Sequence, residues 1–514
     1  MAAGSNGAIK LIFRLKKRVP QNETCAEFIR NNMGKMGKNE FDLIVIGAGS
    51  GGLGAALGML TLGFKVLLVD KKAANFGGEC LHTGCVPSKA LLYIAGQIHA
   101  GRSAGRFGPQ LQGEVDFKKV KHYIHEKQNS ILAHENPDYL REQGMHIALG
   151  TASFISKNEI KVQDNTYKAR NIVIATGSSP RSMKIEGAQD FPVFTNETVF
   201  DVEYIPRNFV FIGAGPVGIE LGQAFSRLGS KVSFVVRGNC ILEKEDPEIS
   251  GVLLEKLKEE GIAFYFDTEV KEIKNADTAV VLQKNGDEKA IPADAIFLGL
   301  GRELNFEALH LDKAGIKTKN GKIILNEKLQ TSNKNVFVAG DAADNLKFSH
   351  AAGMHNALII KNFISPKKEK LSVAHFPWVT FTDPEVATFG LNEAKLKEKK
   401  KNYEKLEISL GEADKAVTND FEYGRLILFV EKKRFFAGSA KILGGSMVAP
   451  HAGEITQELV LANVAGLTLS DLMEKIYAYP TAGNINKIIA RKRIVKEIKP
   501  WMKKILVQWY RFKE

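Results

Sequence analysis

Two glycine-rich turns, each between a short apolar strand and a helix, constrain the fold of this chain more than any other feature. The first turn follows residues 41–46 and holds Gly47, Gly49 and Gly52 in the spacing GxGxxG. A helix rich in alanine and leucine and a second strand ending at Asp70 come next, in the order that a dinucleotide-binding unit requires. The helix start would offer N–H groups to phosphates, and Asp70 would bind a ribose. A structural turn without a ligand is the alternative.

The same pattern recurs later in the chain. Gly213, Gly215 and Gly218 follow an apolar strand and begin another helix. Two such units predict two dinucleotides, one a flavin and one a nicotinamide. The second unit has Val236 where the ribose-binding acid would stand, followed by Arg237, and this exchange accommodates a 2′-phosphate. We therefore expect NADPH rather than NADH; a surface arginine without a ligand is the alternative.

Two cysteines lie between these units, in the segment GGECLHTGCVPSKAL at residues 77–91. Cys80 and Cys85 are five positions apart and can meet across one helical turn, so a reversible disulfide is compatible with the spacing. A helix start and the nearby Lys89 would make such a pair reactive. A zinc half-site and two unrelated thiols are the alternatives. No second Cys/His pair has ligand spacing, so we expect no metal site.

The cysteine segment resembles the redox-active disulfide segment of the class I pyridine nucleotide–disulfide oxidoreductases. This family includes dihydrolipoamide dehydrogenase, glutathione reductase and mercuric reductase. The resemblance covers about residues 41–490, with further landmarks at residues 174–180, 300–305, 336–341 and 376–385.

The resemblance implies an α/β fold of two Rossmann-like domains, the second inserted in the first, followed by a C-terminal α+β dimerisation domain. The expected segments are a basic extension (1–40), the first part of the FAD-binding domain (41–186), the NAD(P)-binding domain (187–302), the second part of the FAD-binding domain (303–370), the dimerisation domain (371–490) and a basic amphipathic tail (491–514).

The resemblance also implies roles for individual residues. NAD(P)H would reduce the flavin, which would then reduce the disulfide. Cys85 would be the thiol in charge-transfer contact with the flavin, and Cys80 the interchange thiol that attacks the substrate. Lys89 and Glu220 would form an ion pair near the reactive flavin nitrogen. Flavin-contacting positions would be Gly150, Thr176, Gly177, Ser178 and Asp341, with Gly301 at the nucleotide and His350 either near the flavin pyrimidine or simply packed or capping a helix.

Two features depart from the family pattern. Dihydrolipoamide dehydrogenase and glutathione reductase carry a histidine before Pro-Thr and a glutamate five positions later, where this chain has Tyr479 and Asn484. Tyrosine, with a pKa near 10, is a poorer proton donor than histidine, which weakens the case for a simple dithiol or glutathione substrate. Residues 491–514 also lack the cysteine pair that mercuric reductase needs, so mercuric reduction is not expected. The chain looks most similar to the mercuric-reductase-like branch.

The net charge of +13 lies almost wholly at residues 1–22 and 491–514, and the nearly neutral body argues against nucleic-acid binding. In the tail, Ile494, Ile498, Trp501, Ile505 and Trp509 recur at helical spacing, and Pro500 predicts a new helix. This stripe would dock either on protein or on an anionic membrane surface.

No secretory signal or membrane-spanning apolar run is visible, although the basic N-terminus weakly resembles an organellar transit peptide. We therefore expect a cytoplasmic protein, with peripheral contact at the inner face of the membrane as a further option.

The sequence therefore predicts an FAD-dependent NAD(P)H oxidoreductase that passes electrons through Cys80 and Cys85 to an unidentified small-molecule or protein acceptor. By the resemblance it is a homodimer in which the Tyr479 region of one chain completes the cysteine site of the other. One alternative is a membrane-surface flavoprotein that reduces a quinone or a metal-type acceptor. Another is a catalytically degenerate flavoprotein acting as a binding subunit, against which the intact Cys80, Cys85, Lys89 and Glu220 argue.

Overall fold

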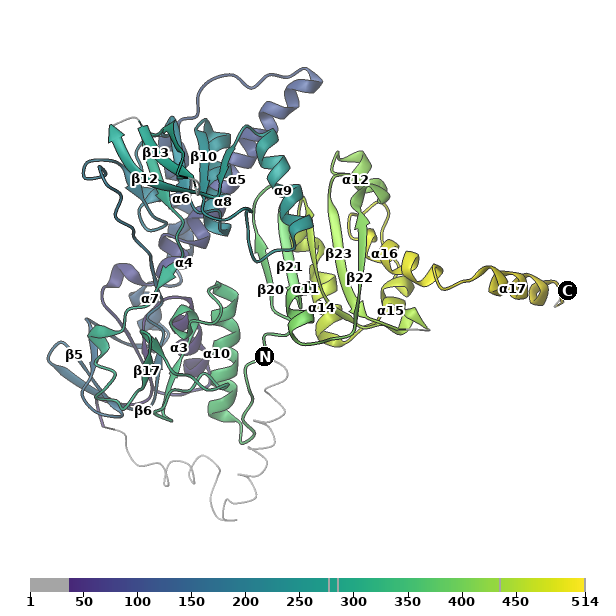
Figure 1. Cartoon of the computed structure of the whole chain (residues 1–514). Coiled ribbons are helices and arrows are strands. Elements are labelled where there is room, and N and C mark those ends of the chain that lie inside the picture. Colours follow the sequence, from purple (N-terminus) through teal and green to yellow (C-terminus); the bar gives the residue numbers. More distant parts are fainter. Residues whose placement is uncertain (1–36, 276–277, 284–285, 434–435, 513–514) are drawn as a thin grey trace, which may run out of the picture. The chain divides into compact units, whose positions relative to one another are not determined.

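The computed structural model describes residues 37–275, 278–283, 286–433 and 436–512 (Figure 1). Most of the predicted basic extension, and Cys25, lie outside these ranges. The chain divides into two compact units. Unit 1 contains the described residues up to Ala90, Lys119–Arg181 and Gly301–Leu371; unit 2 contains Leu91–Lys118, Ser182–Leu300 and the residues from Ser372 onward.

Unit 1 is built on a seven-stranded sheet that contains the first predicted strand–turn–helix–strand pattern. Its order is β3-β2-β1-β6-β5-β4, with β19 also paired to β6. The β1, β2, β3, β6 and β19 pairings are parallel, and such strands are nearly continuous apolar runs because helices or loops cover both faces. The bounds are β1 Glu40–Ile46, β2 Val66–Asp70, β3 His146–Leu149, β4 Ala152–Phe154, β5 Glu159–Val162, β6 Asn165–Ile174 and β19 Val336–Val338.

The helices of unit 1 follow directly from these strands. Helices α3 (Ser50–Thr61) and α10 (Ser349–Ile364) pack against each other, and their residues share one hydrophobic cluster with β1 and β2. The short helix α4 (Gly78–His82) is followed by α5 (Cys85–Ser103), whose residues from Leu91 onward belong to unit 2. The chain returns to unit 1 at Lys119, within α6 (Phe117–Leu132), and continues into α7 (Pro137–Glu142). The two-residue strands β7 (Ser179–Pro180) and β16 (Arg302–Glu303) pair antiparallel where the chain leaves and re-enters this unit. Unit 1 is therefore discontinuous in sequence.

Unit 2 contains the second strand–turn–helix–strand pattern. A parallel sheet has the order β11-β10-β9-β15-β8. Its strands carry buried aromatic rings, among them Phe209, Phe211 and Phe234. A separate antiparallel sheet, β12-β13-β14, follows the last helix of this domain. The bounds are β8 Val193–Phe194, β9 Asn208–Ile212, α8 Pro216–Leu228, β10 Lys231–Val236, α9 Pro247–Glu259, β11 Ala263–Phe266, β12 Thr268–Asn275, β13 Thr278–Gln283, β14 Glu288–Pro292 and β15 Ala295–Leu298.

The C-terminal part of unit 2 is an antiparallel sheet of order β20-β21-β24-β23-β22. Helices pack on it around one large hydrophobic cluster. The predicted combination of two Rossmann-like domains with an α+β domain is confirmed. The bounds are β20 Pro377–Thr380, β21 Glu385–Gly390, α11 Glu393–Glu398, β22 Tyr403–Ser409, α12 Asp414–Thr418, β23 Arg425–Glu431, β24 Ile442–Ala449, α13 Ala452–Ile455, α14 Gln457–Ala465, α15 Leu469–Glu474 and α16 Asn484–Val495.

The predicted amphipathic tail is not one continuous stripe. Helix α16 extends to Val495, and Ile494 packs against the core of the C-terminal domain. A separate helix, α17, begins at Pro500 and ends at Phe512. The prediction that Ile494 lies on one helical face with Trp501 and Trp509 is therefore wrong, because a non-helical segment separates the two helices. The new helix predicted at Pro500 is confirmed. Within the described part of the chain, no helix has the length and apolarity needed to cross a bilayer.

Candidate active site

The first glycine turn has a geometry that only glycine fits. Gly47 has φ +108°, and a Cβ there would lie 2.3 Å from the Ala175 carbonyl oxygen. A Cβ on Gly52 would lie 1.6 Å from the Gly47 carbonyl oxygen. Helix α3 starts directly after Gly49, and no side chain caps it. The turn therefore brings a helix amino terminus, with its positive dipole end, to the carboxyl edge of the sheet, where a phosphate would bind.

Asp70 ends β2 beside this turn. One carboxylate oxygen accepts a hydrogen bond from the Ala48 backbone N–H (2.7 Å), and the other accepts one from the Asn75 side chain (3.1 Å). Asp70 thus fixes the glycine turn as well as standing at the predicted ribose position. Each oxygen has a second lone pair that a ribose hydroxyl could use.

Two buried polar atoms near this turn have no hydrogen-bond partner among the residues that the structure describes. The Asn356 side chain donates to the Ser50 carbonyl at the start of α3 (3.2 Å), while its own oxygen has no partner. His355 is fully buried; its Nδ1 accepts from the Gly340 N–H (3.1 Å), and its Nε2 has no partner. Burial lowers the pKa of His355 to about 4, so the ring is neutral. Because buried polar groups normally have partners, this region fits a polar ligand such as FAD.

Two of the predicted flavin-contacting residues on the other loops contact the same arginine. Ser178 donates to the Asp341 carboxylate (2.7 Å), and Arg302 donates to the Ser178 hydroxyl (2.6 Å) and to the Ser178 carbonyl (2.6 Å). Asp341 also lies 3.4 Å from the Arg302 guanidinium. Gly150 and Gly177 both have positive φ at the ends of their strands, and Thr176 is exposed between strand and loop. Nothing in the sequence indicated that Arg302 belongs to this group.

Cys80 and Cys85 lie together as free thiols. Cys80 is in α4 and Cys85 is the first residue of α5. The Ser349 hydroxyl donates to the Cys80 sulfur (3.2 Å) and lies 3.4 Å from the Cys85 sulfur. A hydrogen bond from the Cys85 thiol, with help from Ser349 and Ser50, lowers the pKa of Cys80 to about 6. The same hydrogen bond raises the pKa of Cys85. The pair therefore shares one proton, and the thiolate belongs to Cys80.

A second contact of Arg302 holds the helix that carries Cys80. The Arg302 guanidinium binds both oxygens of the Glu79 carboxylate, one of them at 2.5 Å. Two parallel N–H···O bonds fix both distance and orientation. Arg302 therefore connects the cysteine helix to Ser178 and Asp341. The only hint in the sequence was an acid next to a reactive cysteine, and nothing indicated its partner 223 positions later.

His350 lies on the exposed first turn of α10, with its ring 5.3 Å from the Phe348 ring. The buried histidine of this helix is His355, which the sequence did not single out.

The second glycine turn has the same construction with more open space. Gly213 has φ +94°, and a Cβ there would lie 2.6 Å from the Gly299 carbonyl oxygen. Helix α8 begins after Gly215, again without a side-chain cap, and a Cβ on Gly215 or Gly301 would meet nothing within 4 Å. A Cβ on Gly218 would lie 3.0 Å from the Gly213 carbonyl oxygen. Arg237 is exposed directly after the buried Val236 that ends β10.

Glu220 and Lys89 occupy different units. Glu220 is buried in α8, and its carboxylate accepts a hydrogen bond from the Phe381 backbone N–H (2.8 Å). Lys89 lies in unit 1, one helical turn after Cys85 on α5. The predicted ion pair between them therefore stays a prediction.

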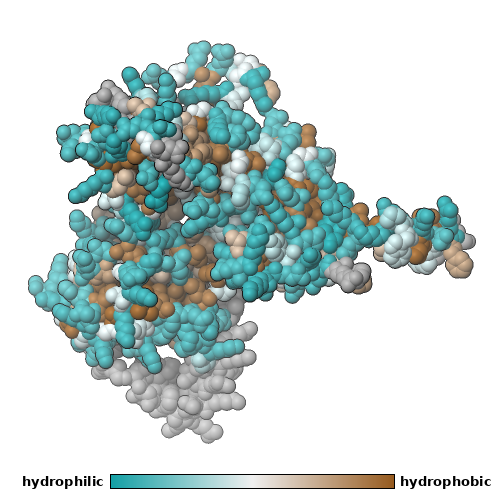
Figure 2. All heavy atoms as spheres, in the orientation of Figure 1, coloured by the Kyte–Doolittle hydropathy of each residue, from teal (hydrophilic) through white to brown (hydrophobic). Residues whose placement is uncertain are grey.

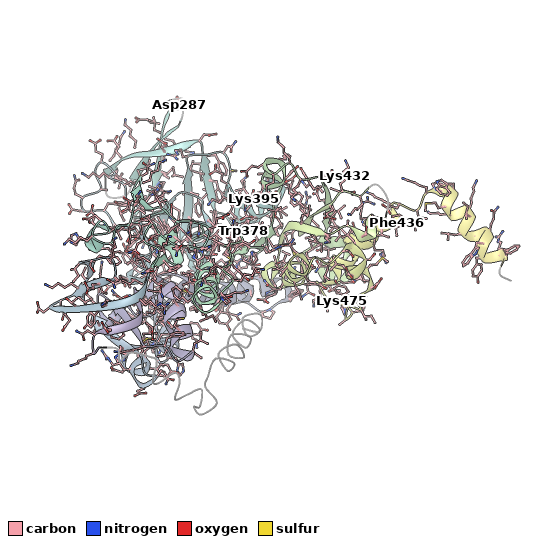
Figure 3. All side chains as sticks on the ribbon, turned by 90° about the horizontal axis from the view of Figure 1, so that it is seen from below. Asp287, Trp378, Lys395, Lys432, Phe436 and Lys475 are labelled. Atoms are coloured by element: carbon pink, nitrogen blue, oxygen red, sulfur yellow. The ribbon has the colours of Figure 1, made fainter. Side chains whose placement is uncertain are left out.

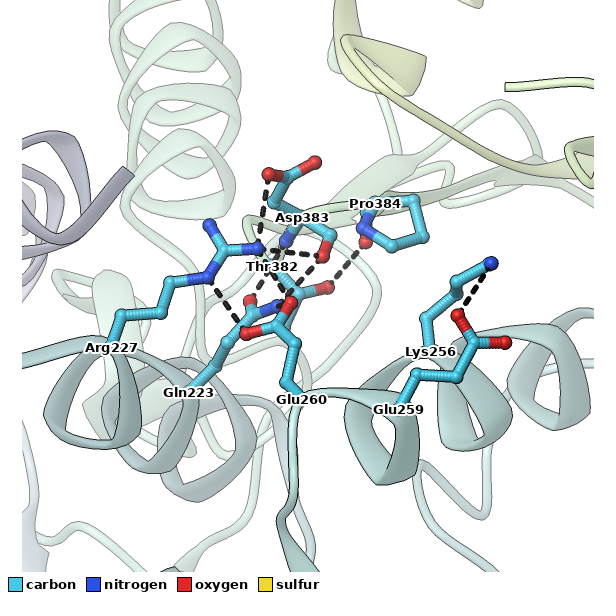
Figure 4. Close-up of polar contacts among 8 residues, drawn as sticks. All are labelled: Gln223, Arg227, Lys256, Glu259, Glu260, Thr382, Asp383 and Pro384. Atoms are coloured by element: carbon cyan, nitrogen blue, oxygen red, sulfur yellow. Dashed lines mark hydrogen bonds and ion pairs between the residues drawn. The ribbon is translucent and has the colours of Figure 1, made fainter. Parts of the chain in front are cut away.

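A polar cluster one turn further along α8 fixes the loop that follows β20 (Figure 4). Arg227 binds both oxygens of Glu260 (2.8 and 2.6 Å) and lies 3.0 Å from the Asp383 carboxylate. Gln223 accepts from the Asp383 N–H (2.8 Å) and donates to its carbonyl (2.7 Å). The helix that carries Glu220 is thereby attached to the loop that follows β20 at two points, Phe381 and Asp383.

Tyr479 is 77% exposed, and its hydroxyl donates to the Asp414 carboxylate (2.9 Å). This hydrogen bond raises the pKa of Tyr479 above its ordinary value. The tyrosine therefore keeps its proton near neutral pH, as expected from the substitution of histidine. Across the residues that the structure describes, no cluster of three or more His, Cys, Asp or Glu side chains could hold a metal ion.

Two family models match the chain. The model described as pyridine nucleotide-disulphide oxidoreductase covers residues 41–356, and its dimerisation domain covers residues 376–487. The chain belongs to the pyridine nucleotide-disulphide oxidoreductases. It is therefore an NAD(P)H-dependent oxidoreductase that binds FAD and carries the family's dimerisation domain. This confirms the predicted enzyme class, the flavin and a nicotinamide nucleotide, whereas the choice of NADPH over NADH stays a prediction.

Individual relatives agree with this assignment. The chain is 31% identical to mercuric reductase of Staphylococcus aureus over 456 residues, which is 88% of this chain and 82% of that protein. It is 31% identical to dihydrolipoyl dehydrogenase of Chlamydia trachomatis serovar D, over 87% and 95% of the two chains. The structure of the HOCl-induced flavoprotein disulfide reductase RclA from Escherichia coli has the same fold, with a TM-score of 0.77 at 21% identity over 88% of this chain and 99% of that one.

Proposed function

We propose that this enzyme takes electrons from NADPH and delivers them through the Cys80–Cys85 pair to an acceptor that needs no proton donor. Bound FAD would supply two-electron transfer from the nicotinamide to the disulfide. The observation that carries the proposal is the placement of both cysteine sulfurs against the Ser349 hydroxyl, at 3.2 Å for Cys80 and 3.4 Å for Cys85. In this arrangement the hydrogen bond from Cys85 lowers the pKa of Cys80 to about 6. At neutral pH Cys80 is thus mainly a thiolate, which is the nucleophilic form.

The chemistry of the dithiol follows from this order of pKa values. The Cys80 thiolate attacks the oxidised acceptor, which for a disulfide forms a mixed disulfide and releases one thiolate. Cys85 loses its proton and attacks the Cys80 sulfur, which releases the second thiolate and closes the Cys80–Cys85 disulfide. Two electrons leave the pair, and the proton of Cys85 goes to solvent or to the leaving group. Ser349 lies against both sulfurs and can hold a hydrogen bond throughout.

The identity of the acceptor is limited by the proton chemistry. Tyr479 replaces the histidine that would protonate a departing thiolate, and its raised pKa makes it a weaker acid still. We therefore infer an acceptor that accepts electrons without protonation by the enzyme, such as a metal ion or an activated disulfide. The alternative is a quinone, whose two-electron reduction would take its two protons from solvent. RclA has been described in complex with Cu(II), which makes that ion a reasonable candidate.

The dimerisation domain supports a homodimer. We propose that the exposed Tyr479 region completes the cysteine site of a second copy. We also propose the cytoplasm as the compartment, because a cysteine pair that must cycle between thiol and disulfide forms fits a reducing environment. Residues 187–302 and 371–490 are proposed as the nucleotide and interface domains within this dimer.

An acceptor panel tests the proposal. The holoenzyme is supplied with NADPH and, separately, Cu(II), Hg(II), a quinone, lipoamide and glutathione disulfide, and NADPH oxidation is followed. We expect turnover with a metal ion or a quinone at least tenfold above that with lipoamide or glutathione disulfide, and loss of metal turnover in Cys80→Ser. Efficient lipoamide turnover, or metal turnover that Cys80→Ser leaves intact, would contradict it.

A further inference from the structure

Helix α17 (Pro500–Phe512) has one apolar and one basic face, and none of its residues is buried. At about 100° per residue, the apolar side chains share an arc of roughly 140°. Lys503, Lys504 and Arg511 lie opposite, and the helix contains no acidic residue. Figure 2 shows hydrophobic and hydrophilic surface side by side on this helix. The apolar arc consists of Trp501 (61% exposed), Met502, Ile505 (53%), Leu506 (55%), Trp509 (56%) and Phe512 (89%).

The segment before α17 packs on the C-terminal domain, whereas α17 itself is exposed. Arg493 on α16 forms an ion pair with Glu404 (2.7 Å), and the Glu497 carboxylate accepts from the Ala437 N–H (2.9 Å). Ile494 packs against the core. The exposed apolar face starts only at Trp501, so it is not the edge of the domain core.

We propose that α17 docks this enzyme on the surface of an anionic lipid bilayer. Tryptophan, tyrosine and phenylalanine are suited to the boundary between headgroups and acyl chains, because they combine an apolar ring with, in Trp and Tyr, a polar atom. Lysine and arginine on the opposite face attract anionic headgroups. A helix of 13 residues is about 20 Å long, which suits it to lie in the interface rather than to cross it.

A second copy of the chain fits this face less well. Pairing two α17 helices would bring together two segments that each carry three cations and no anion. Two helices of about 20 Å would also bury much less than the roughly 1,200 Å² of a stable specific interface. Tryptophan and phenylalanine along the whole arc differ from the aliphatic residues that a coiled-coil seam prefers.

The test measures binding rather than turnover, so its outcome is independent of the redox proposal. FAD-loaded enzyme is floated with vesicles of phosphatidylcholine alone or with 30% phosphatidylglycerol. Ile505→Glu places a negative charge in the apolar arc, and Val507→Glu places the same charge on the opposite face, between Lys503 and Arg511. A chain that stops after Lys499 removes α17 but keeps α16 intact. The absorbance of bound FAD and the melting temperature of each variant confirm folding.

We expect wild type to float with the anionic vesicles and not with the neutral ones. Val507→Glu should lower partitioning by about fivefold, the effect of one charge near the surface. Ile505→Glu should lower it at least tenfold more, because it also removes an apolar contact. Equal effects of the two substitutions, or no flotation of wild type, would overturn the proposal. It would also be overturned if Ile505→Glu reduced the molecular mass by light scattering but left flotation unchanged, which would assign the face to a second copy.

Discussion

At the scale of single residues, Arg302 determines the surroundings of the thiols more than any residue of the glycine motifs. It neutralises Glu79 next to Cys80 and joins that helix to Ser178. In Arg302→Gln the Glu79 carboxylate keeps its charge but loses the positive charge of Arg302, and a like charge near a thiolate raises the thiol pKa. We expect the alkylation of Cys80 by iodoacetamide at pH 6 to slow by roughly threefold.

The matched control for Arg302→Gln is Glu79→Gln combined with Arg302→Gln, which removes both charges and should restore the pH midpoint of alkylation. A single variant that lowers the melting temperature but leaves that midpoint unchanged would show that Arg302 acts on structure alone.

The proposed preference for NADPH depends on Arg237. It is exposed immediately after β10, where a 2′-phosphate would lie if the nucleotide binds as in other Rossmann-like units. We expect Arg237→Ala to raise KM for NADPH about tenfold, since a charge-assisted hydrogen bond contributes roughly 1.5 kcal/mol, with kcat unchanged. Steady-state kinetics with both nucleotides check this; a parallel rise in KM for NADH would show that Arg237 does not recognise the phosphate.

At the scale of elements, two buried carboxylates link the loop before α9 to the C-terminal sheet. Glu245 accepts hydrogen bonds from Trp378 on β20 and Thr388 on β21 (2.5 Å each), and Asp246 accepts from Ser446 on β24 (2.7 Å). Lys395 lies over the Trp378 ring, 5.2 Å from its centroid (Figure 3). Burial raises the pKa of both acids.

The sign of the pH dependence follows from these raised pKa values. The folded chain holds protons that the unfolded chain has lost, so the contribution to stability is complete below about pH 4, the unfolded pKa, and is lost as pH rises through the folded pKa. Glu245→Gln cannot ionise, so its melting temperature should gain on wild type between pH 5 and pH 8. Differential scanning calorimetry across that range checks this, and a difference independent of pH would contradict it.

How much of the fold and site the sequence predicted depends on how local each signal is. The glycine turns were predictable because Gly47 and Gly213 encode a positive φ within a few residues. Contacts between distant segments were not: neither the Arg302–Glu79 pair nor the burial of His355 leaves a periodic pattern. The error at Ile494 has a similar cause, since spacing of three and four residues is the same on a packed helix and on an exposed one.

At the scale of the whole molecule, two nucleotide-binding units, a cysteine pair and a dimerisation domain occur in one chain whose excess positive charge lies at its ends. The near-neutral charge of the body between them argues against nucleic-acid binding, whereas the basic helix α17 has an exposed apolar face. Electron transfer and the location of the enzyme would thus depend on separate parts of the sequence, so each can be removed without the other.

The central claim is that Cys80 and Cys85 cycle between a disulfide and a dithiol. The most direct test is differential alkylation of the FAD-loaded enzyme before and after anaerobic reduction by NADPH, with labelled sites located by peptide mass spectrometry. The exposed Cys240 serves as an internal control that should be labelled in both states. The account predicts two new labels, on Cys80 and Cys85, only after NADPH. Full labelling of both cysteines before reduction, or no new label after it, would contradict the account.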